Sequence, residues 1–149
     1  MRWNVQHHNA RTVIDDSYNA NPVSMTAALK AFADTRGFTG KWLVLGGMLE
    51  LGDSTRAFHY QLGKEVSQGS WKGLVAFGDQ GVHIANGARA EGMPASNIHW
   101  CERHAEVVEI LSALTRPGDA ILIKASRGER MDAVLELWAQ QMDTEQTGA

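Results

Sequence analysis

The chain has 149 residues, of which 44% are apolar and 21% charged, and its formal net charge is -3. This size and composition predict one soluble globular domain with a single substantial core. No apolar run approaches the roughly 20 residues of a membrane helix, and the scattered Lys and Arg form no basic stripe for nucleic acid. We therefore expect no membrane and no nucleic-acid partner.

Cysteine and histidine usage excludes further classes. Cys101 is the single cysteine, so an internal disulfide is ruled out, and the first residues lack the pattern of a signal peptide. A cytoplasmic location is the expectation. His7 and His8 are neighbours on a predicted strand and face opposite sides, and Cys101 with His104 has no second pair at zinc spacing. We expect no metal site on these residues.

The N-terminal part predicts a hairpin followed by a helix. Residues 3–7 and 11–15 are short extended segments separated by three residues. Asn21 then suits the N-cap of a helix and Pro22 its first turn, where proline loses no hydrogen bond. The apolar positions of this helix have the spacing of one buried face, and they are Met25, Ala28, Leu29 and Phe32.

Two apolar runs in the middle of the chain predict central parallel strands. Residues 42–45 and 74–77 are unbroken, bounded by glycines, and typical of strands covered on both faces. Each precedes a helix, which we expect Asp53 and Asp79 to cap. The first of these helices carries apolar residues at intervals of four, namely Phe58, Leu62 and Val66.

The C-terminal third predicts two more strands and two more helices. Residues 97–100 are short and partly polar, as expected of an edge strand, whereas residues 120–124 are a clear buried strand. Helices are expected around residues 105–111 and 131–138. We expect a single domain over residues 1–142 and a frayed polar tail over 143–149.

The order of these elements predicts the fold class. Strand and helix alternate five times, counting from the second strand of the hairpin, which favours right-handed crossovers and helices on both faces of a sheet. The expected architecture is a Rossmann-like, three-layer α/β domain. Its mostly parallel sheet has about six strands, one of them an antiparallel N-terminal strand.

Three polar loops follow the carboxyl ends of predicted strands, over residues 15–21, 46–52 and 126–128. In a parallel sheet they lie at one edge, where α/β proteins bind ligands. Arg127 can hold a carboxylate or phosphate with two parallel hydrogen bonds. It can equally form a surface ion pair with Glu129 or Asp132. Neither G-x-G-x-x-G nor G-x-x-x-x-G-K-[ST] occurs, so the chain lacks a glycine-rich loop for phosphates.

Four stretches carry a resemblance to a known family. They are His59 and the segments 15–22, 44–52 and 124–131, which read DDSYNANP, VLGGMLELG and KASRGERM. Together they resemble the C-terminal domain of the Mur ligases. Within that family they are most similar to the ligases that add D-alanyl-D-alanine to UDP-N-acetylmuramoyl-tripeptide. Gly47 departs from the family, where aspartate is more frequent.

The resemblance implies a three-domain, ATP-dependent amide ligase of peptidoglycan synthesis. In that family ATP converts a carboxylate to an acyl phosphate, which the incoming amine attacks. ATP and Mg are held mainly by the central domain, which this chain lacks. Because Met1 stands near the start of the family's third domain, we expect an isolated C-terminal domain, monomeric and inactive alone. Its implied role is to close over its own central domain.

Site residues follow from the same resemblance. Nucleotide contacts are implied for Asp16, Tyr18, Asn19 and Asn21. Ser126 and Arg127 are implied to lie toward the dipeptide and the acyl phosphate. No residue is assigned as catalytic or as a metal ligand. Two alternatives stay open: a non-catalytic α/β module that binds a ligand or partner, and the C-terminal domain of a related folate-type or cyanophycin-type amide ligase.

Overall fold

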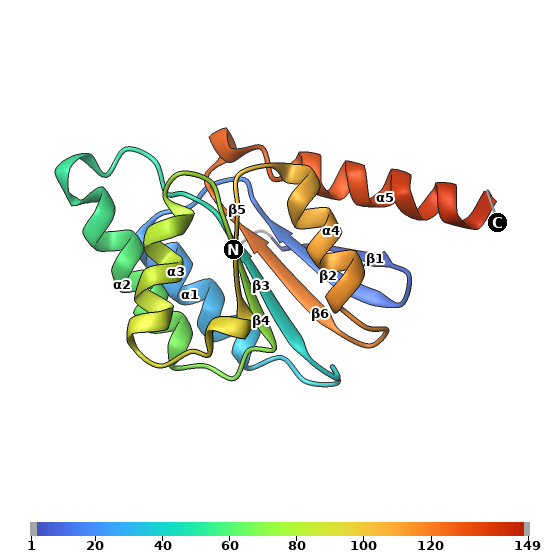
Figure 1. Cartoon of the computed structure of the whole chain (residues 1–149), viewed down its shortest axis with the longest axis horizontal. Coiled ribbons are helices and arrows are strands. Elements are labelled where there is room, and N and C mark those ends of the chain that lie inside the picture. Colours follow the sequence, from blue (N-terminus) through green and yellow to red (C-terminus); the bar gives the residue numbers. More distant parts are fainter. Residues whose placement is uncertain (1–2, 148–149) are drawn as a thin grey trace.

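A computed structural model of the chain describes residues 3–147, with side chains described over residues 3–142. One sheet carries six strands in the order β1-β2-β6-β3-β4-β5 (Figure 1). β1 is antiparallel to β2, and all other neighbours are parallel. The strands are β1 (Asn4–His8), β2 (Arg11–Asp16), β3 (Lys41–Leu45), β4 (Gly73–Phe77), β5 (Ile98–Cys101) and β6 (Ala120–Lys124).

Helices cover both faces of this sheet, which confirms the predicted three-layer α/β fold. α1, α2 and α3 lie side by side on one face, and α4 and α5 lie on the other (Figure 1). The helices are α1 (Pro22–Ala33), α2 (Thr55–Ser67), α3 (Gly81–Ala90), α4 (His104–Leu114) and α5 (Asp132–Thr147). Short 3₁₀ turns span Gly52–Ser54, Ala95–Asn97 and Arg127–Glu129.

The core has two layers because successive side chains of a strand point to opposite faces. In β3, Leu43 and Leu45 pack with α1, α2 and α3, whereas Trp42 and Val44 pack against α4 and α5. Both faces of the strand are therefore buried, as its unbroken apolar sequence predicts. Within residues 3–147, no helix has the length and apolar character needed to span a membrane.

The start of α1 agrees in detail with its sequence. Asn21 is the N-cap, and its side-chain oxygen accepts a hydrogen bond of 2.8 Å from the Ser24 N–H. The Ser24 hydroxyl in turn accepts one of 3.0 Å from the Asn21 N–H, which completes a capping box. Pro22 occupies the first turn, and the four predicted apolar residues of the helix are buried. The turn before α1 is thus anchored at its helical end.

Two predicted caps and one predicted core residue are wrong. Asp53 lies inside the 3₁₀ turn Gly52–Ser54, and α3 begins after Gln80 rather than after Asp79. Neither helix start has a side-chain cap among the described hydrogen bonds. Phe58 is 41% exposed, whereas its neighbour His59 is fully buried, because α2 turns a polar side chain inward to bind the preceding loop.

The last helix continues beyond the predicted core segment. α5 runs to Thr147, so part of the segment expected to fray is helical, and residues 148–149 lie outside the described residues. Its buried residues near the start are those expected, with Met131 just before the helix and Val134, Leu135 and Trp138 within it. Trp138 stacks on His8 of β1, with ring centroids 5.3 Å apart. The N-terminal hairpin is therefore held against the last helix.

Candidate functional site

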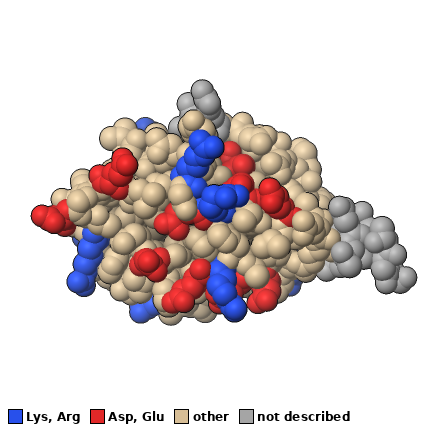
Figure 2. Space-filling view, turned by 90° about the horizontal axis from the view of Figure 1, so that it is seen from above, with Lys and Arg blue, Asp and Glu red and all other residues tan. Residues whose placement is uncertain are grey.

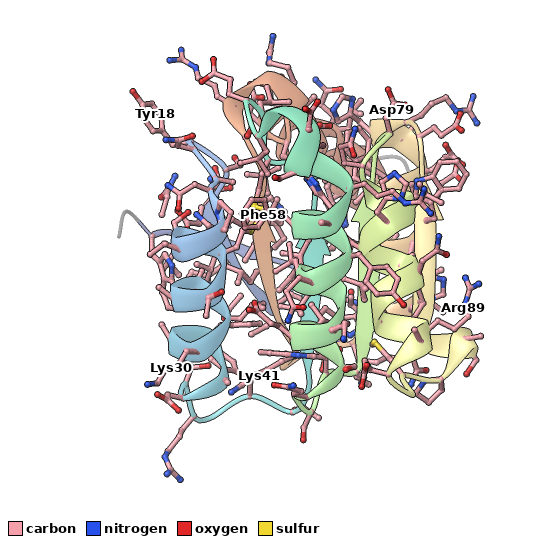
Figure 3. All side chains as sticks on the ribbon, turned by 90° about the vertical axis from the view of Figure 1, so that its left-hand side faces the viewer. Tyr18, Lys30, Lys41, Phe58, Asp79 and Arg89 are labelled. Atoms are coloured by element: carbon pink, nitrogen blue, oxygen red, sulfur yellow. The ribbon has the colours of Figure 1, made fainter. Side chains whose placement is uncertain are left out.

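The three polar loops meet at one edge of the sheet, as predicted. β2, β6 and β3 are adjacent and parallel, so the loops that follow their carboxyl ends are neighbours. Tyr18 lies at this edge, and Lys30 and Lys41 lie at the opposite end of the domain (Figure 3). Figure 2 looks down on the edge and shows basic and acidic side chains interspersed over its centre.

A buried ion pair supports the first loop. Asp16 and Lys124 are paired across β2 and β6, and the Lys124 ammonium donates to the Asp16 carboxylate at 2.9 Å. Both side chains are less than a tenth exposed. The same ammonium donates to the backbone carbonyl of Asn19 at 3.0 Å. Lys124 therefore connects the end of a strand to the middle of the turn.

Asp15 and Asp16 serve opposite sides of the turn, as the alternation of a strand requires. Asp15 accepts hydrogen bonds from both the N–H and the hydroxyl of Ser17, so it shapes the turn itself. The Asn19 side chain accepts from the Ala20 N–H at 2.9 Å. The polar residues of the turn thus satisfy one another's backbone groups, which allows the loop to keep a defined shape without covering elements.

Tyr18 and Arg127 join the first loop to the third. The Arg127 guanidinium lies over the Tyr18 ring, 5.5 Å from its centroid, although the phenol side chain as a whole is 60% exposed. The ion pair considered for Arg127 is formed by another residue. Arg130 donates to both oxygens of Asp132, at 3.0 and 3.1 Å. Arg127 is thus directed toward the first loop.

Two pockets lie on either side of Tyr18. One has a volume of about 350 Å³ and is lined by Asp16, Tyr18, Asn19, Asn21, Ser24, Ala27 and Lys124. The other has a volume of about 520 Å³ and is lined by Asp15, Ser17, Tyr18, Arg127, Arg130 and Asp132. Four of the predicted site residues share the first pocket, and Arg127 faces the second. Ser126 lines neither of them.

Ser126 joins the second and third loops instead. Its hydroxyl, buried in the fold, accepts a hydrogen bond of 2.9 Å from the Leu49 N–H. Its own N–H donates to the Gly47 carbonyl at 2.8 Å. These two bonds hold the segment after β3 against the segment after β6. The observed contacts of Ser126 therefore position the residues around it.

His59, on α2, holds the second loop in place through a hydrogen bond. Its Nε2 accepts a hydrogen bond of 2.8 Å from the Met48 N–H, so the ring proton is on Nδ1, which donates to the Thr55 carbonyl at 2.6 Å. Burial lowers the pKa of His59, the Thr55 contact opposes this, and nearby His83 adds to the lowering. The neutral ring is the form that this geometry requires.

Comparison with known proteins assigns the family. The family model described as "Mur ligase, glutamate ligase domain" matches residues 1–127. The chain belongs to the Mur ligase C-terminal domain family. The resemblance carried by the three loop segments is thereby confirmed.

Two curated relatives of this Mur ligase domain have the same name. UDP-N-acetylmuramoyl-tripeptide--D-alanyl-D-alanine ligase of Bacillus subtilis is 34% identical over 125 residues, which are 84% of this chain and 27% of the relative. The protein of the same name from Escherichia coli is 32% identical over 124 residues, or 83% of this chain and 26% of the relative. The chain spans about a quarter of the length of the curated relatives it matches.

Solved structures agree with this assignment. The MurF ligase of Thermotoga maritima, in complex with ADP, superimposes with a TM-score of 0.78 at 26% identity. The match covers 95% of this chain and 31% of the MurF chain. A crystal structure of MurF from Acinetobacter baumannii gives the same TM-score and identity, with 92% and 30% covered. The sheet order and helix placement described above are therefore those of the Mur ligase C-terminal domain.

Three residues of this edge were not singled out by sequence reasoning. Lys124 looked like the end of a strand, and its role depends on the register that places it opposite Asp16. Arg130 has a left-handed backbone, with φ 54°, which the sequence does not signal in a residue other than glycine. Glu129 was considered only as a surface partner of Arg127, yet it is half-buried against glycines.

The described side chains do not form a self-sufficient metal site. No group of three or more His, Cys, Asp or Glu residues in the described part of the chain could hold an ion. Cys101 is buried, and burial together with Glu106 and Glu109 raises the pKa of its thiol to about 11. A thiol in this environment is unreactive at neutral pH. The charged and polar groups that line the two pockets beside Tyr18 are carboxylates, amides, hydroxyls, guanidinium groups and the Lys124 ammonium.

Proposed function

We propose that the chain is the C-terminal domain of an ATP-dependent ligase that joins D-alanyl-D-alanine to UDP-N-acetylmuramoyl-tripeptide in peptidoglycan synthesis. The observation that carries the proposal is the contact of Tyr18 with Arg127, which joins two signature loops and separates two pockets. The shared name of the curated relatives supports the substrates. The chain spans about a quarter of the length of those proteins, and we propose that other parts of the ligase complete the site.

The smaller pocket is proposed to face the nucleotide. Tyr18 presents a ring face that suits stacking, and Lys124 brings a positive charge to the pocket wall. Asp16 acts through Lys124, and Asn21 acts by capping α1, so both position the wall. When bound, ATP supplies the phosphoryl group that activates the tripeptide carboxylate. The residues here fit one side of such a ligand, and Mg is assigned mainly to the central domain.

The larger pocket is proposed to receive the dipeptide. Its lining combines the guanidinium groups of Arg127 and Arg130 with the carboxylates of Asp15 and Asp132. The pocket therefore suits a zwitterion better than a simple anion. Arg127 can bind the dipeptide carboxylate with two parallel hydrogen bonds, while Asp15 faces its amino group. Ser126 holds the backbone that presents Arg127. The chain thus orients the amine for attack on an acyl phosphate.

Both pockets are open at this edge, and we propose that the central domain of the same ligase closes over them. Such closure would exclude water from the acyl phosphate, which water otherwise hydrolyses. We further propose that the ligase works in the cytoplasm, as a monomer. The isolated domain is expected not to catalyse the reaction.

The test is Arg127→Lys in the complete ligase. Lysine keeps the charge but cannot form the bidentate contact, so we expect kcat/KM for the dipeptide to fall by about tenfold or more. The measurement is dipeptide-dependent ADP release under steady-state conditions. Arg116→Lys, at the far end of the sheet, is the matched control and is expected to leave kcat/KM for the dipeptide unchanged. Unchanged kinetics for Arg127→Lys would remove this residue from the site.

A further inference from the structure

The Glu129 side chain occupies space that two glycines leave open. A Cβ atom built on Gly47 would lie 2.5 Å from one Glu129 carboxylate oxygen, and one built on Gly78 would lie 2.8 Å from the other. Contacts this short do not occur between real atoms of these kinds, so a side chain at either position would push the end of the flexible Glu129 side chain out of this space. Gly47 follows β3 and Gly78 follows β4, whereas Glu129 follows β6.

The Glu129 carboxylate is half-buried between these loops. Burial and the nearby Asp79 raise the pKa of Glu129, whereas a hydrogen bond from the Gly47 backbone and the proximity of His104 oppose that rise. His104, at the start of α4, also bonds to the Glu129 backbone carbonyl through Nε2, at 2.8 Å. The main chain of Glu129 is therefore anchored, and the Gly47 backbone and His104 partly offset the cost of burying its carboxylate.

Glu129 lies beside the bonds that organise the second loop. The Gly46 N–H donates to the Lys124 carbonyl at 3.0 Å, and the Ser126 N–H donates to the Gly47 carbonyl. The Leu49 N–H reaches the Ser126 hydroxyl. Because Gly47 is in the middle of this set, a carboxylate that fixes Gly47 also fixes the backbone around Ser126.

We propose that Glu129 is a positioning residue, whose carboxylate locks the loops after β3, β4 and β6 together and so sets the placement of Ser126 and Arg127. It fills the space above Gly47 and accepts the Gly47 N–H, and it closes over Gly78. The consequence for substrate binding rests on the function proposed above. The lock itself is a property of this chain and can be tested without any substrate.

The first test is a double-mutant cycle between positions 47 and 129. Gly47→Ala in the wild-type background forces Glu129 out, and we expect the melting temperature to fall by about 3–8 °C. In a Glu129→Ala background, Gly47→Ala should lower the melting temperature by less than half as much. Equal shifts in the two backgrounds would overturn the proposal. If Gly47→Ala does not fold alone, folding of the double variant supports the lock, and failure of both contradicts it.

The second test measures amide hydrogen exchange at Leu49 and Ser126. Glu129→Ala should accelerate both amides about tenfold, whereas Glu129→Gln, which keeps an acceptor for the Gly47 N–H, should restore their protection. Glu109→Ala, an exposed carboxylate on α4, is the matched control and should leave them unchanged. Unaltered exchange in Glu129→Ala would refute the lock.

Steady-state kinetics of the complete ligase distinguish this proposal from the proposed function. In the complete ligase, Glu129→Ala should raise KM for the dipeptide several-fold and leave KM for ATP unchanged, with rescue by Glu129→Gln. An equal rise in both KM values, or no rescue, would contradict a positioning role. Intact loop protection in a wild-type ligase that lacks dipeptide-dependent activity would instead overturn the proposed function and leave the lock standing.

Discussion

The two ends of the sheet both bury a carboxylate, but they satisfy it differently. At the amino end, Asp119 is fully buried and accepts hydrogen bonds from the Trp42 indole at 3.3 Å and the Arg116 N–H at 2.9 Å. Lys72 approaches the same carboxylate at 3.4 Å, with its side chain 42% exposed. At the carboxyl end, Asp16 is paired with Lys124, which is itself buried.

This difference teaches that a buried charge alone does not mark a site. Asp119 is surrounded by donors from the backbone and from an indole, so it serves to close the end of the domain. The Lys124 ammonium instead has one carboxylate and one carbonyl as described partners, and it lines a pocket. We therefore propose that the buried Lys124 ammonium contributes to ligand binding because it lines the pocket beside Tyr18, whereas Asp119 is satisfied within the fold.

The largest expected effect comes from breaking the pair at the functional end. Lys124→Met leaves Asp16 buried without a counter-charge, and the free energy of unfolding should fall by about 3–5 kcal/mol. Urea titration measures the loss. The double variant Lys124→Met, Asp16→Leu removes both charges and should recover most of the stability. A double variant as unstable as the single one would show that packing, not charge, explains the loss.

The next effect tests the structural end. Asp119→Ala leaves the Trp42 indole and the Arg116 N–H without their acceptor, and we expect a loss of about 1–3 kcal/mol. The loss is smaller than for Lys124→Met because Lys72 is partly exposed and can be hydrated. The same urea titration measures it. A loss larger than that of Lys124→Met would reverse the comparison.

The sequence predicted the order of strands and helices well because the apolar spacing of a helix and the apolar run of a buried strand are both local patterns. The buried face of α1 and the glycine-bounded β3 are examples. It failed where a polar side chain finds its partner through tertiary structure. His59 is buried because the Met48 N–H reaches it, and Lys124 is buried because the strand register places it opposite Asp16. Neither contact has a signature in spacing.

The arrangement of the candidate site's loops was predicted in part for the same reason. Tyr18 and Arg127 belong to loops whose placement at one edge follows from the parallel sheet, so their meeting could be expected from topology. The pairing of Asp132 with Arg130 rather than with Arg127 could not be expected from topology, because it depends on the left-handed backbone of Arg130. Ser126 was placed near the substrate, whereas its observed contacts are internal.

A smaller effect is the pH dependence of the second loop. The pKa of His59 in the folded chain lies below its unfolded value, so the folded state disfavours the charged ring. Its contribution to stability is fully present above about pH 6.5 and is lost as the pH falls through the folded pKa. His8 and His99 have pKa values lowered by burial and act in the same direction.

The variant His59→Gln isolates this contribution. Glutamine does not titrate, so the loss of stability between about pH 7 and pH 5 should be smaller in the variant than in the wild type. Chemical denaturation at several pH values measures both slopes. His7→Gln, on the exposed part of β1, is the comparison variant. His7 lowers the pKa of its neighbour His8, so this change should alter the slope less than His59→Gln does. Equal slopes for wild type and His59→Gln would contradict the assigned neutral ring.

The smallest effect concerns the exposed pair at the rim of the larger pocket. Arg130 and Asp132 are both more than half exposed, so solvent screens their attraction and the pair should add little to stability. Arg130 also carries a left-handed backbone, with φ 54° and ψ 46°, which glycine adopts without strain. Arg130→Gly should therefore be more stable than Arg130→Ala, although both lose the same ion pair.

Comparing these two variants separates backbone strain from charge. Thermal melts at low and at high salt measure both terms, because salt weakens the ion pair and leaves the strain unchanged. Equal melting temperatures for the glycine and alanine variants would show that the left-handed backbone carries no strain. In contrast to the buried Asp16–Lys124 pair, an ion pair with so little effect on stability leaves the Arg130 guanidinium available to a bound carboxylate, which is the use that the larger pocket favours.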